Sequence, residues 1–171
     1  MTALVVVGGL PGTGKSTIAA HASQLLGATL LSKDVLEAAL RRSGIDRAAG
    51  SGWASYEQLT SVAESQLRLA HSVVLDSVAT NERIRTAWRD LAASRGARFV
   101  AIECVCSDET VHRSRVEGRD RGIPGWPELT WADVEDVRSH YELWSDADRL
   151  VLDAARPLDE NLAALVASLR E

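Results

Sequence analysis

Short apolar runs alternate along the chain with longer stretches in which apolar residues recur every three or four positions. The short runs predict buried strands, and the wider spacing predicts helices with one buried face. Strands and helices that alternate in this way are typical of an α/β protein, in which a parallel sheet lies between two layers of helices. The pattern therefore predicts a sheet of five parallel strands, at residues 4–7, 28–31, 72–76, 99–105 and 149–153.

Helical spacing fills most of the sequence between these strands. It covers residues 18–26, 35–42, 56–70, 81–94, 130–144 and 157–169, with a short helix expected from residue 107 or 108. Residues 43–55 are rich in glycine and serine and predict a mobile loop, in which Trp53 either faces a substrate or anchors the loop. No repeat or change of composition marks a boundary, so residues 1–171 are expected to form a single domain.

Composition narrows the class of protein. A hydrophobic content of 46% is normal for a soluble globular protein, and no apolar run approaches the ~20 residues that span a bilayer. The first strand begins almost at once without a secretion signal, and Cys104 and Cys106 fit neither a disulfide framework nor a zinc site. We therefore expect a cytoplasmic protein with reduced, buried thiols. A net charge of −5 argues against a strong electrostatic grip on long nucleic acid.

The first strand leads into a glycine-rich loop, Gly-Gly-Leu-Pro-Gly-Thr-Gly-Lys-Ser-Thr at residues 8–17. This loop matches the Walker A pattern G-x-x-x-x-G-K-[ST], and it stands between a predicted strand and a predicted helix, as the pattern requires. Gly12 and Gly14 lack a Cβ atom, so the backbone can take positive φ angles and turn its N–H groups toward phosphate oxygens.

The motif predicts a site for ATP and Mg²⁺. Lys15 is expected to reach the β- and γ-phosphates of ATP, and the Ser16 hydroxyl is expected to bind Mg²⁺. The residues expected to bind the nucleotide are Gly12, Thr13, Gly14, Lys15, Ser16 and Thr17.

Two aspartates follow predicted strands and would lie at the phosphate-binding edge of a parallel sheet. Asp34 either accepts the proton of a substrate hydroxyl or orients that hydroxyl, or it caps the following helix. Asp76 ends an apolar strand in the Walker B manner, which predicts an acid near Mg²⁺. Ser77 stands where a hydrolysing ATPase of the ring-forming type usually carries a water-activating glutamate, so this position favours phosphoryl transfer over hydrolysis.

An arginine-rich stretch at residues 112–121 precedes a glycine- and proline-rich segment that cannot stay helical. Together they predict a lid over ATP, at about residues 113–130. Arg115 and Arg119, at positions i and i+4, are expected to share one helix face and to serve catalysis, with Arg119 the nearer to the γ-phosphate. His112 and Arg113 are expected at the surface. Arg156, in the loop after the last strand, is expected to flank the base of ATP.

These motifs resemble those of small P-loop kinases. The stretches that carry the resemblance are Gly-Leu-Pro-Gly-Thr-Gly-Lys-Ser-Thr, Leu-Ser-Lys-Asp34, Val-Val-Leu-Asp76-Ser and Arg115-Val-Glu-Gly-Arg119. They are most similar to the kinase domain of polynucleotide 5′-hydroxyl kinases, and are also similar to gluconate kinases, chloramphenicol phosphotransferases and zeta-type toxin kinases. The resemblance implies the strand order 2-3-1-4-5, a general base at Asp34, and a contact of Arg119 with the transferring phosphate.

One position departs from the polynucleotide kinase pattern. Three residues after the base that pattern carries an arginine for a substrate phosphate, whereas Glu37 stands here. We expect Glu37 to line the acceptor pocket and to disfavour anionic substrates. The sequence therefore predicts a kinase that phosphorylates a hydroxyl of a small molecule. A polynucleotide kinase with a basic groove at Arg41, Arg42 and Arg47, a nucleotide-hydrolysing switch and an inactive nucleotide-binding protein are the alternatives.

Overall fold

The computed structural model describes residues 2–145 and 148–170. It contains a five-stranded sheet in the order β2-β3-β1-β4-β5, which confirms the predicted order. All four strand pairs are parallel. The strands are β1 (Ala3–Gly8), β2 (Thr29–Ser32), β3 (Val73–Asp76), β4 (Arg98–Val105) and β5 (Leu150–Asp153).

The register of the strands brings their carboxyl ends to one edge. Val7 and Ser32 both lie opposite Asp76, so β1, β2 and β3 finish side by side. In an open parallel sheet, ligands bind outside this edge.

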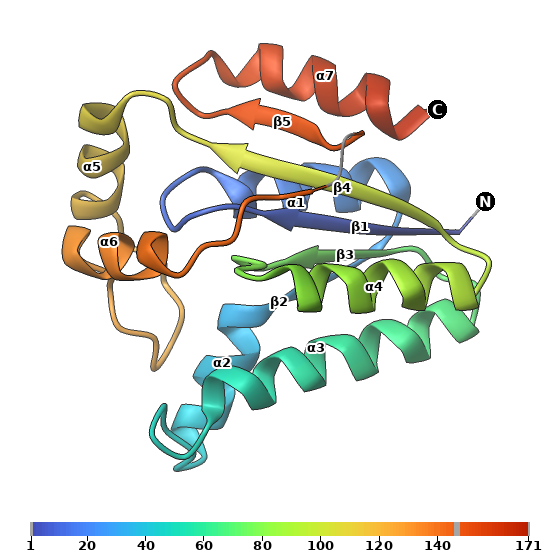
Figure 1. Cartoon of the computed structure of the whole chain (residues 1–171), viewed down its shortest axis with the longest axis horizontal. Coiled ribbons are helices and arrows are strands. Elements are labelled where there is room, and N and C mark those ends of the chain that lie inside the picture. The colour runs from blue at the N-terminus through green and yellow to red at the C-terminus, as the bar shows by residue number, and fades with distance from the viewer. Residues whose placement is uncertain (1, 146–147, 171) are drawn as a thin grey trace.

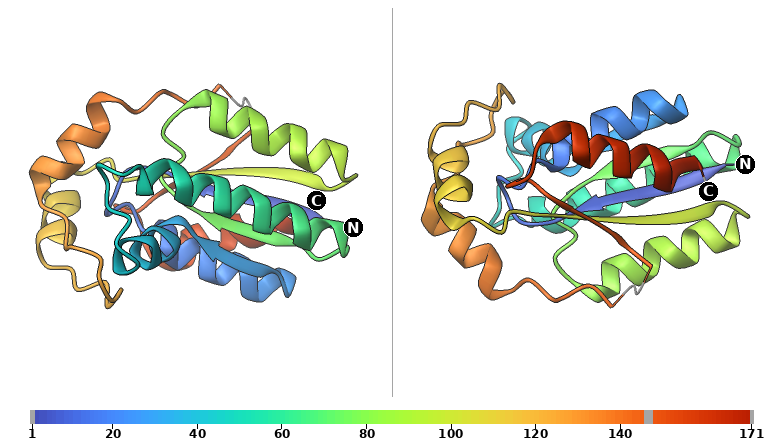
Figure 2. Two further views of the ribbon diagram at one scale, coloured as in Figure 1. Left: turned by 90° about the horizontal axis from the view of Figure 1, so that it is seen from below. Right: turned by 90° about the horizontal axis from the view of Figure 1, so that it is seen from above.

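Helices cover both faces of the sheet and also its carboxyl edge (Figures 1 and 2). Helices α1 and α7 lie on one face and α3 and α4 on the other, while α5 and α6 lie beyond the carboxyl ends of the strands. The helices are α1 (Lys15–Leu26), α2 (Lys33–Arg42), α3 (Ser51–Arg68), α4 (Glu82–Ser94), α5 (Glu109–Glu117), α6 (Trp131–Ser139) and α7 (Leu158–Arg170). None of them, within the described part of the chain, is both long and apolar enough to cross a membrane.

The alternation of side chains along β1 builds two cores. Leu4 and Val6 pack against the α3 and α4 side, together with the fully buried Trp88. Val5 and Val7 pack against the α1 and α7 side. A strand that is apolar at every position is therefore buried on both faces, as is expected of a parallel sheet with helices on each side.

Residues 43–55 differ from the predicted mobile loop, because α3 begins at Ser51. Two serines of this segment are satisfied inside the fold, since the fully buried Ser51 hydroxyl donates to Glu37 and the Ser55 hydroxyl donates to the Gly52 carbonyl. Trp53 therefore lies on a helix and neither faces the pocket nor anchors a loop. It is half-exposed, with the Arg83 guanidinium 5.5 Å from its ring centroid.

The helix expected over residues 130–144 is shorter than predicted and ends at Ser139. Its start is as predicted, because Thr130 and Asp133 form a capping box.

Candidate functional site

A pocket of about 520 Å³ opens at the carboxyl edge of the sheet. Its walls come from the glycine loop, the start of α2, the segment from α5 to α6 and the loop after β5. Of the residues proposed from sequence for catalysis, nucleotide binding and Mg²⁺, all but Asp76 line this pocket: Gly12, Thr13, Gly14, Lys15, Ser16, Thr17, Asp34, Arg115, Arg119 and Arg156. The fold thus gathers residues from four separate segments around one cavity.

The glycine loop has the backbone that the motif requires. Gly12 and Gly14 have φ angles of +86° and +83°. Gly9, with φ of +133°, passes so close to β4 that a Cβ atom there would lie 2.0 Å from the Cys104 carbonyl oxygen. All three positions therefore favour glycine by conformation, and at Gly9 a side chain is also excluded by contact.

Lys15 closes the loop on itself. Its ammonium donates a hydrogen bond of 2.8 Å to the Leu10 carbonyl, which also accepts the Thr13 hydroxyl at 2.8 Å. Burial lowers the pKa of Lys15, while the carboxylates of Asp76 and Asp34 act in the opposite direction. A partly desolvated ammonium is suited to phosphate oxygens, because their negative charge stabilises the charged form that burial disfavours.

Asp76 and Ser16 form an oxygen pair beside Lys15. Asp76 is 7% exposed, and burial raises the pKa of its carboxyl, while Lys15 and a hydrogen bond with Ser16 lower it. Mg²⁺ takes oxygen ligands and is often held by one or two protein groups together with substrate phosphates, so this pair fits it. Among the described residues no cluster of three or more His, Cys, Asp or Glu side chains could hold a metal ion by itself.

His112 corrects the sequence-based expectation of a surface residue. It is 2% exposed, and its Nε2 atom donates a 2.7 Å hydrogen bond to the Pro11 carbonyl of the glycine loop. Its ring stands edge-on to Trp131, with the ring centroids 5.1 Å apart. Burial lowers the pKa of His112, so the neutral imidazole is favoured. Helix α5 therefore braces the phosphate loop.

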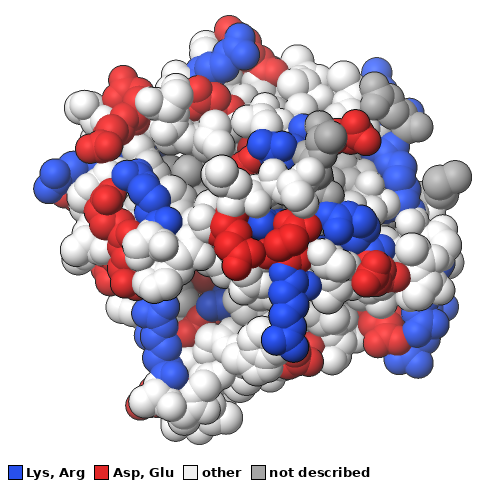
Figure 3. Space-filling model, in the orientation of Figure 1, with Lys and Arg blue, Asp and Glu red and all other residues white. Residues whose placement is uncertain are grey.

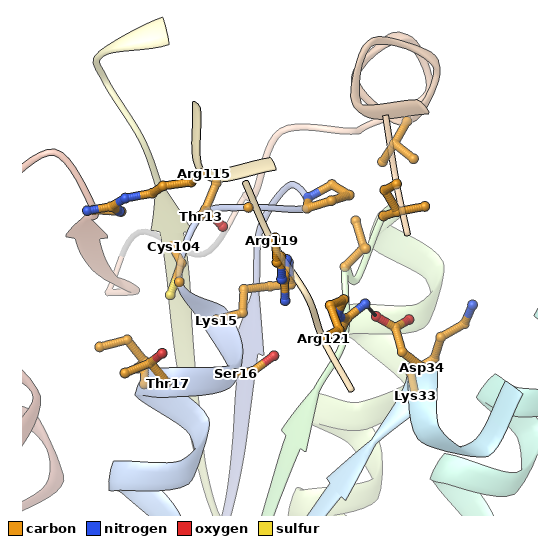
Figure 4. A pocket seen from close by; sticks show the side chains of 18 of the residues that line it. Thr13, Lys15, Ser16, Thr17, Lys33, Asp34, Cys104, Arg115, Arg119 and Arg121 are labelled. Atoms are coloured by element: carbon orange, nitrogen blue, oxygen red, sulfur yellow. Dashed lines mark hydrogen bonds and ion pairs between the residues drawn. The ribbon is translucent and has the colours of Figure 1, made fainter. Parts of the chain in front are cut away.

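Arg115 and Arg119 do not share a helix face as predicted. Helix α5 ends at Glu117, so Arg119 lies beyond the helix and the i, i+4 relation does not apply. Figure 4 shows Arg119 above Lys15, whereas the Arg115 side chain runs away from Lys15 and Asp34. Burial lowers the pKa of Arg119, with Asp34 and Asp76 opposing that shift. Only Arg119 of the pair lies between the glycine loop and α2.

Asp34 lies in the first turn of α2 and faces the glycine loop across the pocket (Figure 4). It does not cap the helix, because the N-cap position belongs to Ser32. Its Oδ2 atom accepts from Arg121, whose side chain is only 8% exposed. Sequence reasoning missed Arg121, although it belongs to the same arginine-rich stretch as Arg119.

The segment between α5 and α6 docks on α2. Arg42 donates to the Pro124 carbonyl, and a Cβ atom on Gly125 would lie 2.8 Å from Arg42 Cγ. Trp126 packs beside α2, with its ring centroid 5.0 Å from Arg41 Cζ and 5.8 Å from Lys33 Nζ. Lys33, Arg41 and Trp126 line the pocket. Lys33 and Trp126 were not identified from the sequence as site residues, and Arg41 was named only for the basic groove of a polynucleotide kinase.

Glu37 lines the pocket as predicted, but its charge is already neutralised. Its side chain is 2% exposed and accepts from Lys33, from Arg41 Nη2 at 3.4 Å and from the Ser51 hydroxyl at 3.0 Å. The prediction that Glu37 disfavours anions loses its basis, because two cations and a hydroxyl share this one carboxylate.

Two further positions were considered from the sequence for nucleotide chemistry, Arg156 and Ser77. Arg156 borders the pocket from the loop after β5 and forms an exposed ion pair with Glu160 at 3.0 Å. Ser77 follows Asp76 and is 3% exposed, so its hydroxyl is covered.

The chain matches solved structures over nearly its whole length. A candidate kinase from Chloroflexus aurantiacus J-10-fl superposes with a TM-score of 0.77 and 26% identity, covering 99% of this chain and 97% of that one. A gluconokinase from Sinorhizobium meliloti 1021 gives 0.72 and 18%, covering 99% and 91%. The Mycobacterium tuberculosis APS kinase CysC, in complex with AMPPNP and APS, gives 0.68 and 21%, covering 99% and 98%. The last two likenesses concern the fold alone.

A curated relative is the uncharacterized protein Rv2004c of Mycobacterium tuberculosis (strain ATCC 25618 / H37Rv). It is 34% identical over an alignment of 127 positions that covers 65% of this chain and 26% of that protein. The chain thus spans about a quarter of the length of the curated relatives it matches. A family model described as an AAA domain, AAA_33, matches residues 4–143. The sheet order, the glycine loop and this match agree, and the chain belongs to the AAA_33 family of P-loop domains.

Proposed function

We propose that the protein is an ATP-dependent phosphotransferase that moves the γ-phosphate of ATP to a hydroxyl group of a small molecule. The observation that carries this proposal is the position of Asp34, whose carboxylate faces Lys15 and Ser16 from the opposite wall of one pocket (Figure 4). An acid placed there can receive a proton from a hydroxyl that attacks a phosphate held by the glycine loop.

The nucleotide half of the pocket suits ATP. The backbone N–H groups of Gly12 and Gly14 and the Lys15 ammonium would hold the β- and γ-phosphates. Ser16 and Asp76 would hold Mg²⁺, which neutralises charge on the phosphate oxygens when it is bound. The APS kinase that shares this fold was solved with the ATP analogue AMPPNP, which supports the same nucleotide class here.

The transfer step then assigns one task to each side chain. The acceptor oxygen bonds to the γ-phosphorus, the bond from that phosphorus to the β,γ-bridging oxygen breaks, and ADP leaves. The acceptor proton passes to Asp34. Because Arg121 occupies Oδ2 of that carboxylate, Oδ1 is the oxygen we assign to the proton. Arg119, above Lys15, would counter charge on the transferring group.

The residues from about 113 to 130 would act as a lid. Arg119 and Arg121 would lie over the phosphates, and the loop would rest on α2 through Arg42. Arg115 and Arg156 would stand on the side of the nucleotide base, because both line the pocket and Arg115 runs away from Lys15 and Asp34 (Figure 4).

Two features favour this reading over its alternatives. The buried Ser77 leaves no carboxylate at the position where ring-forming ATPases activate water, which argues against a hydrolysing module. Basic and acidic side chains are interspersed on the face shown in Figure 3, and the chain carries a net charge of −5, which argues against a polynucleotide acceptor.

The test is a screen of hydroxylated acceptors for ADP release above the rate without acceptor. Sugars, sugar acids, nucleosides and 5′-hydroxyl oligonucleotides should be compared. Acceptor-dependent ADP release with a small molecule supports the proposal. ADP release that no acceptor stimulates would indicate a hydrolysing module, and salt-sensitive labelling of oligonucleotides would indicate a polynucleotide kinase.

Two substitutions assign the chemistry once an acceptor is found. Asp34→Asn should lower acceptor-dependent turnover by roughly 10²–10⁴ and barely change ATP affinity. Lys15→Ala should abolish transfer without unfolding the protein, because the glycine loop can still form its turns. Asp90→Asn, at an exposed position on α4, is the matched control and should leave turnover unchanged.

A further inference from the structure

Beyond Asp34, the pocket continues along α2 as a compartment whose polar groups are hydrogen-bond donors. Lys33, Arg41 and Trp126 line it, and lysine, arginine and tryptophan side chains all donate and none accepts. The one acceptor among them is Glu37, whose two carboxylate oxygens are taken by Lys33 on one side and by Arg41 and Ser51 on the other.

The charge of this compartment is positive on the side that faces the pocket. Two cations share one carboxylate, and the side chains of Lys33 and Arg41 are 13% and 24% exposed, against 2% for Glu37. The acid therefore lies beneath its partners. A molecule in the pocket would meet the ammonium and the guanidinium first.

Two donors in the compartment have no partner. Among the described residues, the Arg41 Nε atom and the Trp126 indole nitrogen are buried and make no hydrogen bond. They belong to neighbouring side chains, because the Arg41 Cζ atom lies 5.0 Å from the Trp126 ring centroid. Buried N–H groups are rarely left unpaired in proteins, and both of these belong to side chains that line the pocket.

From these observations, and resting on the proposed phosphotransferase function, we infer that the acceptor substrate carries an anionic oxygen-bearing group, a carboxylate, phosphate or sulfate, that binds between Arg41, Lys33 and Trp126. Such a group supplies acceptor oxygens and negative charge together, which a neutral polyol does not. Asp34 and Arg41 are seven residues apart on α2, so their Cα atoms are roughly 10 Å apart. The substrate therefore places its phosphorylated hydroxyl and its anionic group within that span.

The lid would complete this anion site. Trp126 belongs to the segment that docks on α2 through Arg42 and Pro124, so its indole N–H reaches the site only when that segment lies on α2. The substrate would enter beside α2 and be covered by Trp126. Trp126 is fluorescent, so its emission should change when an anion occupies the site.

The test uses inorganic phosphate and sulfate as probes on the full chain loaded with AMPPNP and Mg²⁺. The nucleotide occupies the glycine loop, so the probe cannot bind there. Tryptophan fluorescence is followed while the concentration of the probe is raised to about 50 mM. The ionic strength is held constant, because added salt would itself screen exposed charges. We expect a saturable change with a millimolar dissociation constant, and Trp126→Phe should remove the signal.

Substitutions at Arg41 decide the outcome. Arg41→Gln should weaken phosphate binding at least ~10-fold, and Arg41→Lys should weaken it less, because the charge remains while the planar fork is lost. Arg68→Gln, the same change at an exposed position on α3, is the control and should bind as the wild type does. Binding of AMPPNP by each variant shows that it is folded.

The results separate this inference from the proposed function. No saturable phosphate or sulfate binding by the AMPPNP-loaded wild type, or equal binding by Arg41→Gln, would overturn the anion site while leaving the phosphotransferase proposal intact. Conversely, phosphate binding that depends on Arg41, without acceptor-dependent ADP release from any hydroxylated compound, would retain the anion site and overturn the phosphotransferase proposal.

Discussion

Replacement of Gly12 by alanine tests whether α5 holds the phosphate-binding loop in its conformation. Three glycines share almost the same backbone angle, with φ of +86° at Gly12, +83° at Gly14 and +86° at Gly44. Their surroundings differ. A Cβ atom on Gly12 would lie 2.5 Å from Val116 Cγ2, whereas on Gly14 the nearest atom would be 3.9 Å away, and on Gly44 no atom lies within 4 Å.

The substitution lowers stability in two ways, through backbone conformation and through packing, and the three glycines allow these two contributions to be separated. A left-handed backbone costs an alanine about 1–2 kcal/mol at each of the three positions. Overpacking adds about 1–3 kcal/mol at Gly12 alone, because the glycine loop lies against α5. The expected loss is about 2–5 kcal/mol for Gly12→Ala and about 1–2 kcal/mol for Gly14→Ala and Gly44→Ala.

Urea unfolding of the three variants measures these free energies. At about 2–4 °C for each kcal/mol in a chain of this size, Gly12→Ala should lower Tm by about 4–20 °C and Gly44→Ala by about 2–8 °C. The double variant Gly12→Ala/Val116→Ala should lose less stability than the sum of the two single losses, because the smaller side chain at residue 116 makes room for the new Cβ atom. The difference is the coupling energy between the two contacting sites. If Gly12→Ala lowers the free energy of unfolding no more than Gly44→Ala does, α5 does not pack against the loop as closely as the structure indicates.

Further predictions concern the ion cluster, the pH dependence and the lid. Glu37→Ala should lower the free energy of unfolding by about 3 kcal/mol in urea titrations, because it leaves two partly buried cations unpaired, whereas the exposed Glu57→Ala should change it little. The lowered pKa of His112 means that the unfolded chain binds a proton more readily than the folded chain. Stability should therefore fall as the pH drops below about 6.5, and His112→Gln should reduce that fall in urea titrations at several pH values. In steady-state kinetics Arg119→Gln should lower kcat by roughly 10²–10³, while Arg115→Gln should chiefly raise KM for ATP.

The sheet and the phosphate loop could be predicted because each rests on local sequence. Buried parallel strands are apolar at consecutive positions, and the Walker A residues identify the phosphate loop by their spacing alone. The strand order came from the family resemblance rather than from the pattern, and the structure confirms it.

The errors concern side chains whose surroundings are set by contacts between distant segments. His112 stands in a charged stretch, and only its contact with Pro11, 101 residues earlier, explains its burial. The pairing of Arg115 with Arg119 assumed a continuous helix, whereas α5 ends before Gly118.

The surroundings of Glu37 could have been read from the sequence. Lys33, Glu37 and Arg41 are spaced at i, i+4 and i+8 on α2, which is the spacing of helical ion pairs. That spacing predicts a carboxylate between two cations. What it cannot predict is the contact of the cluster with Ser51 and Trp126, because that contact depends on where α3 and the segment after α5 lie in the fold.

Net charge is a weak guide to the substrate of this protein, because charges are sorted by the fold. The chain carries −5 overall, and yet its described pocket lining includes eight cationic residues and four acids. Both lysines of the chain are among those eight. Coulomb interactions act over distances comparable to the pocket, and salt screens exposed charges beyond about 10 Å. A phosphate or carboxylate inside the pocket therefore responds to the local excess of cations, whereas the net negative charge of the chain mainly affects large polyanions that cannot enter.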